Sequence, residues 1–152
     1  MAASAWRTYR DFKTALGLKK IQLATDTIKI ALFLEASNAG DVDLVTAEYA
    51  TLTNQHANAN GYLTGGKTVA ATWNEAAGTL TFDVADPTVW TATGGSIVFR
   101  YLVLYSDTAT NKDLIAYCLA DTTPADITVT LGNTLTITIH ASGVFTMAGG
   151  EA

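Results

Sequence analysis

A chain of 152 residues has the length of one globular domain, and 49% of its residues are hydrophobic while only 15% are charged. The net charge of −5 at pH 7 argues against a surface that neutralises phosphates, so we expect no nucleic-acid partner. Charges throughout the first twenty residues exclude a signal peptide, and no run approaches the roughly 18 apolar residues of a membrane span. We expect a single soluble domain over residues 1–152, made in the cytoplasm, with part of its apolar surface covered by a protein partner.

The first element that the sequence predicts is an amphipathic helix over residues 2–16. Four large side chains recur at helical spacing: Trp6, Tyr9, Phe12 and Leu16. Ser4 is available as the N-cap, and Gly17 is available to end the helix. The aromatic stripe is expected to pack on the body of the domain or, as a protruding arm, on a neighbouring subunit.

A buried strand is predicted over residues 27–34, followed by a long polar loop over residues 35–61. Connections of this length are uncommon in compact domains unless they bind something or contain structure of their own. A short helix over residues 45–52, capped by Asp41 or Asp43, would shorten this loop.

Residues 67–147 read as a succession of strands, with a flexible tail expected over residues 148–152. The predicted strands are 67–73, 79–84, 88–90, 96–105, 114–119, an alternating pair within 126–140, and 144–147. The predicted fold is mainly β: a β-sandwich or jelly-roll-like domain of about eight or nine antiparallel strands with one N-terminal α-helix.

The clearest strand signal is the alternation of apolar residues with threonine over residues 126–140. We predict a hairpin with residues 132–134 as its loop, because only an odd-length loop keeps the apolar residues of both strands on one face. The expected cross-strand pairs are Leu131 with Leu135, Val129 with Ile137, and Ile127 with Ile139, which also places His140 opposite Asp126.

Residues 61–68, Gly-Tyr-Leu-Thr-Gly-Gly-Lys-Thr, match the pattern of a phosphate-binding loop. Such a loop needs a strand before it and a helix after it, because the helix N-terminus and the loop amides hold the phosphates together. A polar segment precedes this match and a strand-like segment follows it. We therefore predict a glycine turn that enters a strand, and no bound nucleotide.

The ionisable residues do not suggest an enzyme, a cofactor or a metal site. Carboxylates gather at Glu35, Asp41, Asp43 and Glu48 and again at Asp83 and Asp86, but without the spacing of a calcium loop, so capping and solvation are favoured. His56 is expected in a polar loop and His140 on a strand surface, and Cys118 reads as an inert strand residue. Two histidines and one cysteine are too few for a zinc site of the usual kind.

Three groups of segments resemble, in the same order, a family of small structural proteins of tailed bacteriophages. They are residues 9–16 with 26–32; residues 61–66 with 82–86 and 89–90; and residues 97–105 with 107, 114–117 and 141–144. The chain differs from the family pattern at residues 136–140, where Thr-Ile-Thr-Ile-His stands in place of a more usual Trp-Asn pair.

The resemblance implies a non-enzymatic virion protein without catalytic residues, cofactor or metal. A capsid decoration or cement protein that stabilises the assembled shell is favoured, with the major capsid protein or other virion proteins as partners. A homo-oligomer is expected, preferably a trimer. The alternatives are a tail or neck component, or a carbohydrate-binding module that would use Trp73, Trp90, Tyr101 and Tyr105 as an aromatic platform.

We place the inter-subunit contacts on the N-terminal helix and the long loop, because one closed core does not require these segments. The residues expected to make the contacts are Trp6, Tyr9, Phe12, Leu16, Val45, Tyr49, Leu52 and Tyr62.

Overall fold

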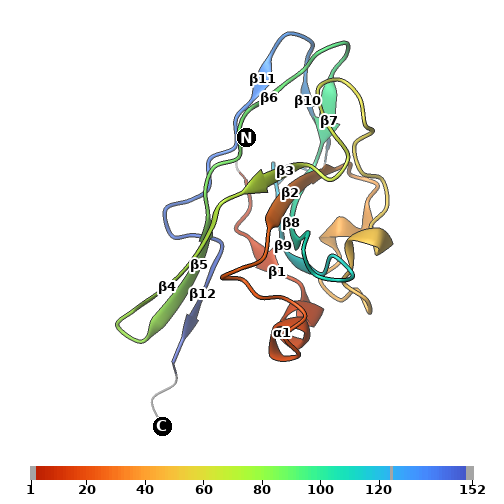
Figure 1. Ribbon diagram of the computed structural model, residues 1–152. Helices are drawn as coiled ribbons and strands as arrows, with labels where there is room; N and C mark the ends of the chain where they lie inside the picture. The colour runs from red at the N-terminus through yellow and green to blue at the C-terminus, as the bar shows by residue number, and fades with distance from the viewer. Residues whose placement is uncertain (1–2, 124, 150–152) are drawn as a thin grey trace.

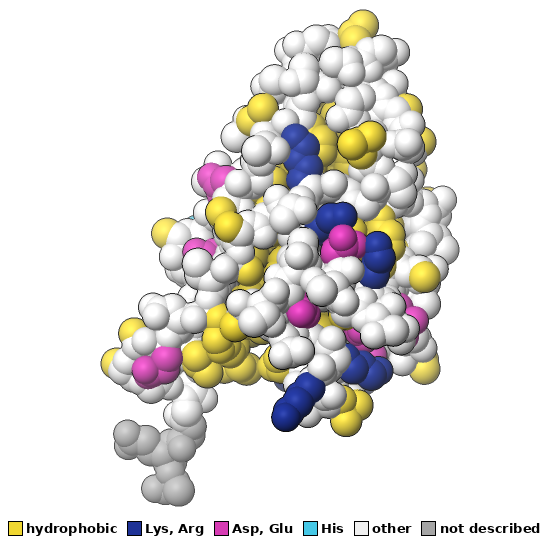
Figure 2. All heavy atoms as spheres, viewed as in Figure 1, with side chains coloured by type: hydrophobic (Ala, Val, Ile, Leu, Met, Phe, Trp, Pro, Cys, Tyr) yellow, Lys and Arg dark blue, Asp and Glu magenta, His cyan; other side chains and the backbone are white. Residues whose placement is uncertain are grey.

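The computed structural model describes residues 3–123 and 125–149 of the chain (Figure 1). Over these residues it contains twelve strands, all paired antiparallel in several sheets, and one α-helix near the N-terminus. The predicted class, a mainly β and sandwich-like domain with an N-terminal helix, is confirmed. The strands outnumber the expected eight or nine because several are only two or three residues long. On the face drawn in Figure 2, Lys and Arg side chains are interspersed with polar and apolar ones.

The largest sheet has five strands in the order β1-β9-β8-β2-β3. Their bounds are β1 Arg7–Thr8, β9 Leu114–Leu119, β8 Tyr101–Ser106, β2 Ile28–Phe33 and β3 Lys67–Val69. Nearly every side chain of β2, β8 and β9 is buried, on both faces of the sheet. Continuous apolar runs are typical of strands that are covered on both sides, and this explains why these three segments do not alternate in sequence.

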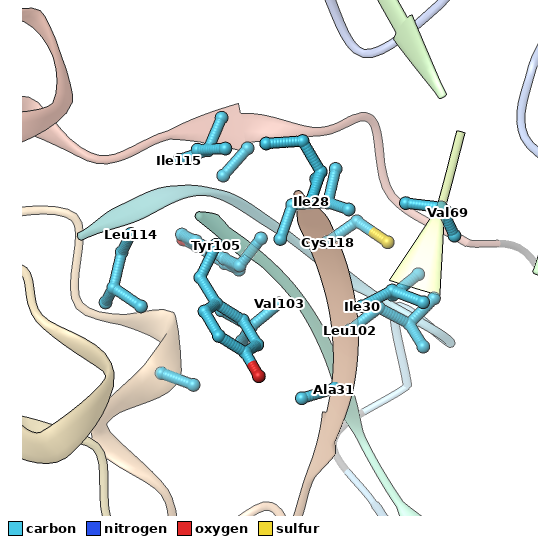
Figure 3. Packing of buried hydrophobic residues seen from close by; sticks show 14 of the residues in the cluster. Ile28, Ile30, Ala31, Val69, Leu102, Val103, Tyr105, Leu114, Ile115 and Cys118 are labelled. Carbon is cyan, nitrogen blue, oxygen red and sulfur yellow. The ribbon is translucent and has the colours of Figure 1, made fainter. Parts of the chain in front are cut away.

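The register of the central strands defines two buried faces, which Figure 3 shows from close by. Ala31 lies beside Val103, and Val103 lies beside Tyr117, so these side chains share one face. Leu32 lies beside Leu102, and Leu102 lies beside Cys118, on the opposite face. Each face therefore needs its own covering layer.

The long loop covers the face that carries Val103. It contains two single turns of 3₁₀ helix, η1 (Asn38–Gly40) and η2 (Tyr49–Thr51), and its Tyr49 ring stacks on Tyr105 with the centroids 4.4 Å apart. The Phe33 ring meets the Tyr49 ring edge-on, with the centroids 6.1 Å apart. The helix predicted over residues 45–52 is wrong, because the segment forms only the single turn η2 and a β-bridge between Glu48 and Asp113. The expectation that this loop contains structure is confirmed.

The N-terminal helix is shorter than predicted. Helix α1 spans Arg10–Gly17, and the residues before it form the edge strand β1 on β9 instead of continuing the helix to residue 2. Ser4 is not an N-cap: its backbone N–H donates to the Leu119 carbonyl oxygen at 2.9 Å, and its hydroxyl accepts the Leu119 N–H at 2.9 Å. Sheet hydrogen bonds thus replace the first helical turns. The predicted end of the helix at Gly17 is confirmed.

The alternating residues 126–140 form strands, but not with each other. Strand β10 (Ile127–Val129) pairs with β7 (Ile97–Phe99), and β11 (Thr134–Leu135) pairs with β6 (Trp90–Thr91). Hydrogen bonds between Ala92 and residues 132–133 join the two ladders into one interrupted antiparallel ribbon.

The predicted hairpin, and with it the pairing of His140 with Asp126, is therefore wrong. Period-two alternation determines which side chains face inward, but it does not identify the segment that supplies the hydrogen bonds. Residues 90–99 carry a matching set of buried side chains in Trp90, Ile97 and Phe99. The inward direction of the isoleucines holds, since Ile137 is buried, whereas Leu131 lies exposed in the turn.

A three-stranded sheet extends from the body beside α1 (Figure 1). It consists of β4 (Ala71–Ala76), β5 (Thr79–Val84) and β12 (Phe145–Ala148) in the order β12-β5-β4. Phe145 contacts the Phe82 ring at 5.2 Å and the Phe12 ring of α1 at 5.3 Å, which holds this sheet against the helix. Ala148, expected in a flexible tail, belongs to β12; residues 150–152 of that predicted tail lie outside the described residues.

Two long predicted strands are each interrupted. Residues 67–73 divide into β3 and β4 around Ala70, and residues 96–105 divide into β7 and β8 around Arg100. The backbone of Arg100 stays bonded on both sides, donating to the Phe33 carbonyl oxygen at 2.7 Å and accepting from the Ala120 N–H at 2.8 Å. The interruptions let one continuous apolar segment contribute to two different sheets.

The match to a phosphate-binding loop is a glycine turn that enters β3, as predicted. Gly66 has a φ of +73°, and a Cβ atom there would collide with the backbone carbonyl oxygen of Ile30. Lys67 is engaged elsewhere: its Nζ donates to the Val89 carbonyl oxygen at 2.7 Å and to the Thr88 hydroxyl at 3.0 Å. The glycine is required by the packing of the turn on β2.

We predict that Gly66→Ala lowers the free energy of unfolding by at least about 2 kcal/mol, because it combines a strained φ with a backbone clash. Gly17→Ala is the matched control, since a Cβ at Gly17 meets no atom within 4 Å. Its effect is expected to stay within about 1 kcal/mol. Urea unfolding monitored by circular dichroism measures both variants, and equal stability of the two would contradict the assigned role of Gly66.

Candidate functional site

The eight predicted contact residues do not form one surface. Tyr9, Phe12 and Tyr62 are core residues with at most 2% of their surface exposed. Four others are partly buried against the core: Trp6, Leu16, Tyr49 and Leu52. Val45 is 97% exposed. The premise that the helix and loop lie outside the core is wrong, because both segments contribute buried side chains to it.

A small hollow lies where the three-stranded sheet meets the helix. It has a volume of about 190 Å³ and is lined by Leu16, Leu23 and Trp73 together with residues of the 22–25 segment. Figure 2 shows hydrophobic side chains exposed in this region. Among the predicted contact residues, only Leu16 lines this hollow.

A much larger apolar cavity, of about 840 Å³, lies on the face of the main sheet that carries Leu102 and Cys118. One side of it is formed by residues 3–6 along the edge of the sheet, and another by residues 135–144. Phe99 and Ile127 also line it. The volume is in the range of ligand pockets in proteins, and the lining is mostly aliphatic and aromatic. Trp6 is the one predicted contact residue that contributes to this cavity.

One wall of the cavity is an extended segment with few hydrogen bonds. Ile137 is buried, Ile139 is partly buried, and the alternate side chains at 136, 138 and 140 are exposed. The Ile139 N–H donates to an Asp86 carboxylate oxygen at 2.7 Å, and the His140 carbonyl oxygen accepts the Gly143 N–H at 2.8 Å. Within the described part of the chain, the backbone groups of residues 136–138 have no hydrogen-bond partner. This segment keeps the alternating burial of a strand but is not paired with a strand among the described residues.

The buried charged residues Asp113 and Arg100 do not line the cavity. Asp113 is 2% exposed, its Oδ1 has no hydrogen-bond partner among the described residues, and burial raises the pKa of its carboxylate. Arg100 donates from Nη1 to the Thr123 carbonyl oxygen at 3.1 Å and lies 3.7 Å from Glu35. Hydrogen bonds from Lys112 and Lys29 lower the pKa of Asp107. Arg100 and Asp107 thus connect loops to strand ends, whereas burial disfavours the charged form of Asp113.

Asp41 and Asp43 make contacts that hold the loop, and Cys118 is buried in its strand. Asp43 pairs with Arg10 at 3.0 Å, and Asp41 accepts the Asp43 N–H at 2.9 Å. Burial raises the pKa of the Cys118 thiol to about 12, which leaves it protonated and unreactive at neutral pH, as expected of an inert strand residue. In residues 3–123 and 125–149, no three His, Cys, Asp or Glu side chains are placed to hold a metal ion.

The proposed aromatic platform for sugars does not exist as a surface. Trp90 and Tyr105 are buried, with 1% and 0% of their surface exposed, and Trp73 and Tyr101 are only partly exposed. Trp90 packs in the core below Lys67, whose Nζ lies 4.9 Å from the ring centroid. Aromatic residues at strand positions are more often core residues than binding residues, as this chain illustrates.

His56 lies in the long loop, as expected, but its side chain is buried. It is 7% exposed, its ring meets the Tyr62 ring edge-on at 5.3 Å, and its Nε2 has no hydrogen-bond partner among the described residues. Burial lowers the pKa of this imidazole below its ordinary value of 6.5, because the charged form is desolvated. The sequence held no signal for this burial, since the residues around His56 are polar.

Comparison of the chain with family models, with curated proteins and with solved structures finds no match in any of the three. Among the described residues, no helix has the length and apolar character needed to cross a membrane.

We predict that acid weakens the fold through His56. The unfolded chain takes up this proton near pH 6.5 and the folded chain only at lower pH, so stability is lost as the pH falls through this window. His56→Phe removes the titrating group, and its free energy of unfolding should fall less than that of the wild type between pH 7 and pH 5.

Urea titrations of both proteins at the two pH values measure this difference. If His56→Phe and the wild type lost equal stability on acidification, the buried imidazole would not be the cause.

Proposed function

We propose that this protein is a non-enzymatic structural protein of a tailed-bacteriophage virion, and that it acts as a decoration or cement protein on the assembled capsid. The observation that carries the proposal is the apolar cavity beside residues 136–138, where no described segment covers the apolar surface or bonds to the backbone. Such a surface favours a protein partner. The resemblance of the sequence to virion proteins supplies the class of that partner.

The distribution of charge supports a binding role over a catalytic one. Lys67, Arg100 and Asp107 are engaged with neighbouring backbone or side-chain groups that hold the fold together. Burial keeps the Cys118 thiol protonated within its strand. A catalytic site needs ionisable groups that converge on a pocket with matched pKa values, whereas the large cavity here is lined mainly by apolar side chains.

A cement protein acts by mass action. It binds the assembled shell in preference to the free capsid subunits, so its binding free energy opposes disassembly. The major capsid protein is the proposed partner, and a homo-oligomer, preferably a trimer on a three-fold or quasi-three-fold axis, would present several copies of the binding surface together. A role in the tail or neck would use the same surface, whereas the burial of Trp90 weighs against carbohydrate binding.

We expect gold-labelled antibody against this chain to decorate intact virions over the whole icosahedral shell in negative-stain electron microscopy. Virions treated to remove the protein should lose the label and release their DNA at a lower temperature, and both properties should return when purified protein is added back. Label at a single vertex would move the protein to the tail or neck. Virions without label would contradict a virion role altogether.

A further inference from the structure

We propose that the apolar cavity and the segment 136–140 together form a binding site for one extended, uncharged polypeptide segment of another protein. The bound segment would add a strand beside residues 136–138 and insert alternate apolar side chains into the cavity. The inference rests on the binding role proposed above, but not on the position of the protein in the virion.

The lining of the cavity requires that the inserted side chains of the bound segment be apolar. Its wall residues Phe99, Leu102 and Ile137 are apolar, and its volume of about 840 Å³ lies on a face of the sheet that is otherwise packed. Apolar side chains that enter such a space gain both burial and dispersion contacts. A charged side chain would lose hydration without an ionic partner, since no Asp, Glu, Lys or Arg of the described residues lines the cavity.

The backbone of residues 136–138 requires that the main chain of the bound segment be extended and able to form hydrogen bonds. The N–H and carbonyl groups of these residues lack partners within the described chain, although the segment is extended and its side chains alternate as in a strand. Addition of a strand at an open edge is a common mode of peptide recognition, in which the main chain supplies hydrogen bonds and alternate side chains enter pockets. A small apolar molecule would fill the cavity but leave these groups unpaired.

The chain itself offers no described segment for this role. Its longest apolar strands, β2, β8 and β9, are paired on both sides within the main sheet. The large hydrophobic side chains most exposed elsewhere are isolated loop and turn residues: Leu18, Val45, Leu63 and Leu131. A second copy docked edge to edge through residues 136–140 would keep its own Ile137 in its own cavity and leave both cavities empty. We therefore assign the site to a different protein.

The test uses the full chain labelled with ¹⁵N and a soluble peptide, acetyl-Lys-Thr-Val-Thr-Val-Thr-Lys-amide, whose two valines lie on one face of a strand. Amide shift changes in titrations should concentrate at residues 3–6 and 136–140, with a change in the Trp6 indole signal. A control peptide with adjacent valines, acetyl-Lys-Thr-Val-Val-Thr-Thr-Lys-amide, places them on opposite faces and should bind at least about tenfold more weakly.

Two further peptides test the hydrogen bonds. Methylation of either the valine or the threonine backbone amides blocks one of the two edges of the strand, so at least one methylated peptide should lose binding by about tenfold or more. Ile137→Asp, which places a carboxylate toward the cavity, should abolish binding, whereas Val45→Asp, at an exposed loop residue that does not line the cavity, should leave binding unchanged. The peptide comparison decides the matter if the Ile137 variant does not fold.

Equal binding of all four peptides, shifts confined to other surfaces, or no binding at millimolar peptide would overturn the inference. The inference would also fail if laurate, but not the peptide, shifted the amide signals of residues 3–6 and 136–140. That result would identify a site for small apolar molecules. Sedimentation of the free chain as a dimer that Thr138→Asp dissociates would assign the surface to a second copy. If the chain bound none of the peptides but did bind capsids, the peptide site would be wrong and the proposed function would still stand.

Discussion

The fold depends on the burial of the central strands β2, β8 and β9 on both faces. Full burial of an aliphatic or aromatic side chain contributes about 1.5–3 kcal/mol, so a sheet with two apolar faces requires a layer over each one. Tyr49 and its neighbours in the long loop cover the face that carries Val103 and Tyr105. Trp90, Ile97 and Val144 belong to the core that covers the rest. The loop and the N-terminal segment are therefore parts of the core, not appendages added to it.

The two layers are not equally complete. The loop closes over its face with stacked aromatic rings and hydrogen bonds such as that from the Tyr9 hydroxyl to the Ala39 carbonyl oxygen at 2.6 Å. The opposite face is closed near Trp90 but left open between residues 3–6 and 135–144. An open apolar space gives up the dispersion contacts that a packed core would make. A partner that fills the space would stabilise the fold of this chain, and by the same binding free energy the assembly to which the partner belongs would be stabilised. A cement protein requires this behaviour.

Much of the architecture could be predicted from local patterns. The strands over residues 79–84 and 114–119 have the predicted bounds, because continuous or alternating apolar runs bounded by turn residues are local signals. Pairing is not local: the partner of residues 127–129 is fixed by contacts with Ile97 and Phe99, some thirty residues earlier in the chain. For the same reason the Trp6 and Tyr9 spacing indicated a helix where β9 imposes a strand at residues 7–8.

The candidate site could not be predicted from the sequence, because no sequence motif encodes its properties. The cavity is an absence of packing between segments near both ends of the chain, and the unpaired backbone at 136–138 has the same period-two sequence as a paired strand. From the low charge content we expected a partner to cover some apolar surface, but the composition does not identify that surface. The expected contact residues were mostly assigned to the helix and loop, whose aromatic side chains serve the core.

Amide hydrogen exchange of the free protein, followed residue by residue by NMR, tests the central claim most directly. If one face is closed and the other left open, Val103 and Leu104 in β8 should exchange only through global unfolding, whereas the amides of residues 136–138 should exchange close to the rate of an unstructured peptide. Strong protection of residues 136–138 in the free protein would show that this edge already has a partner within the chain, and the account of an open face would fail.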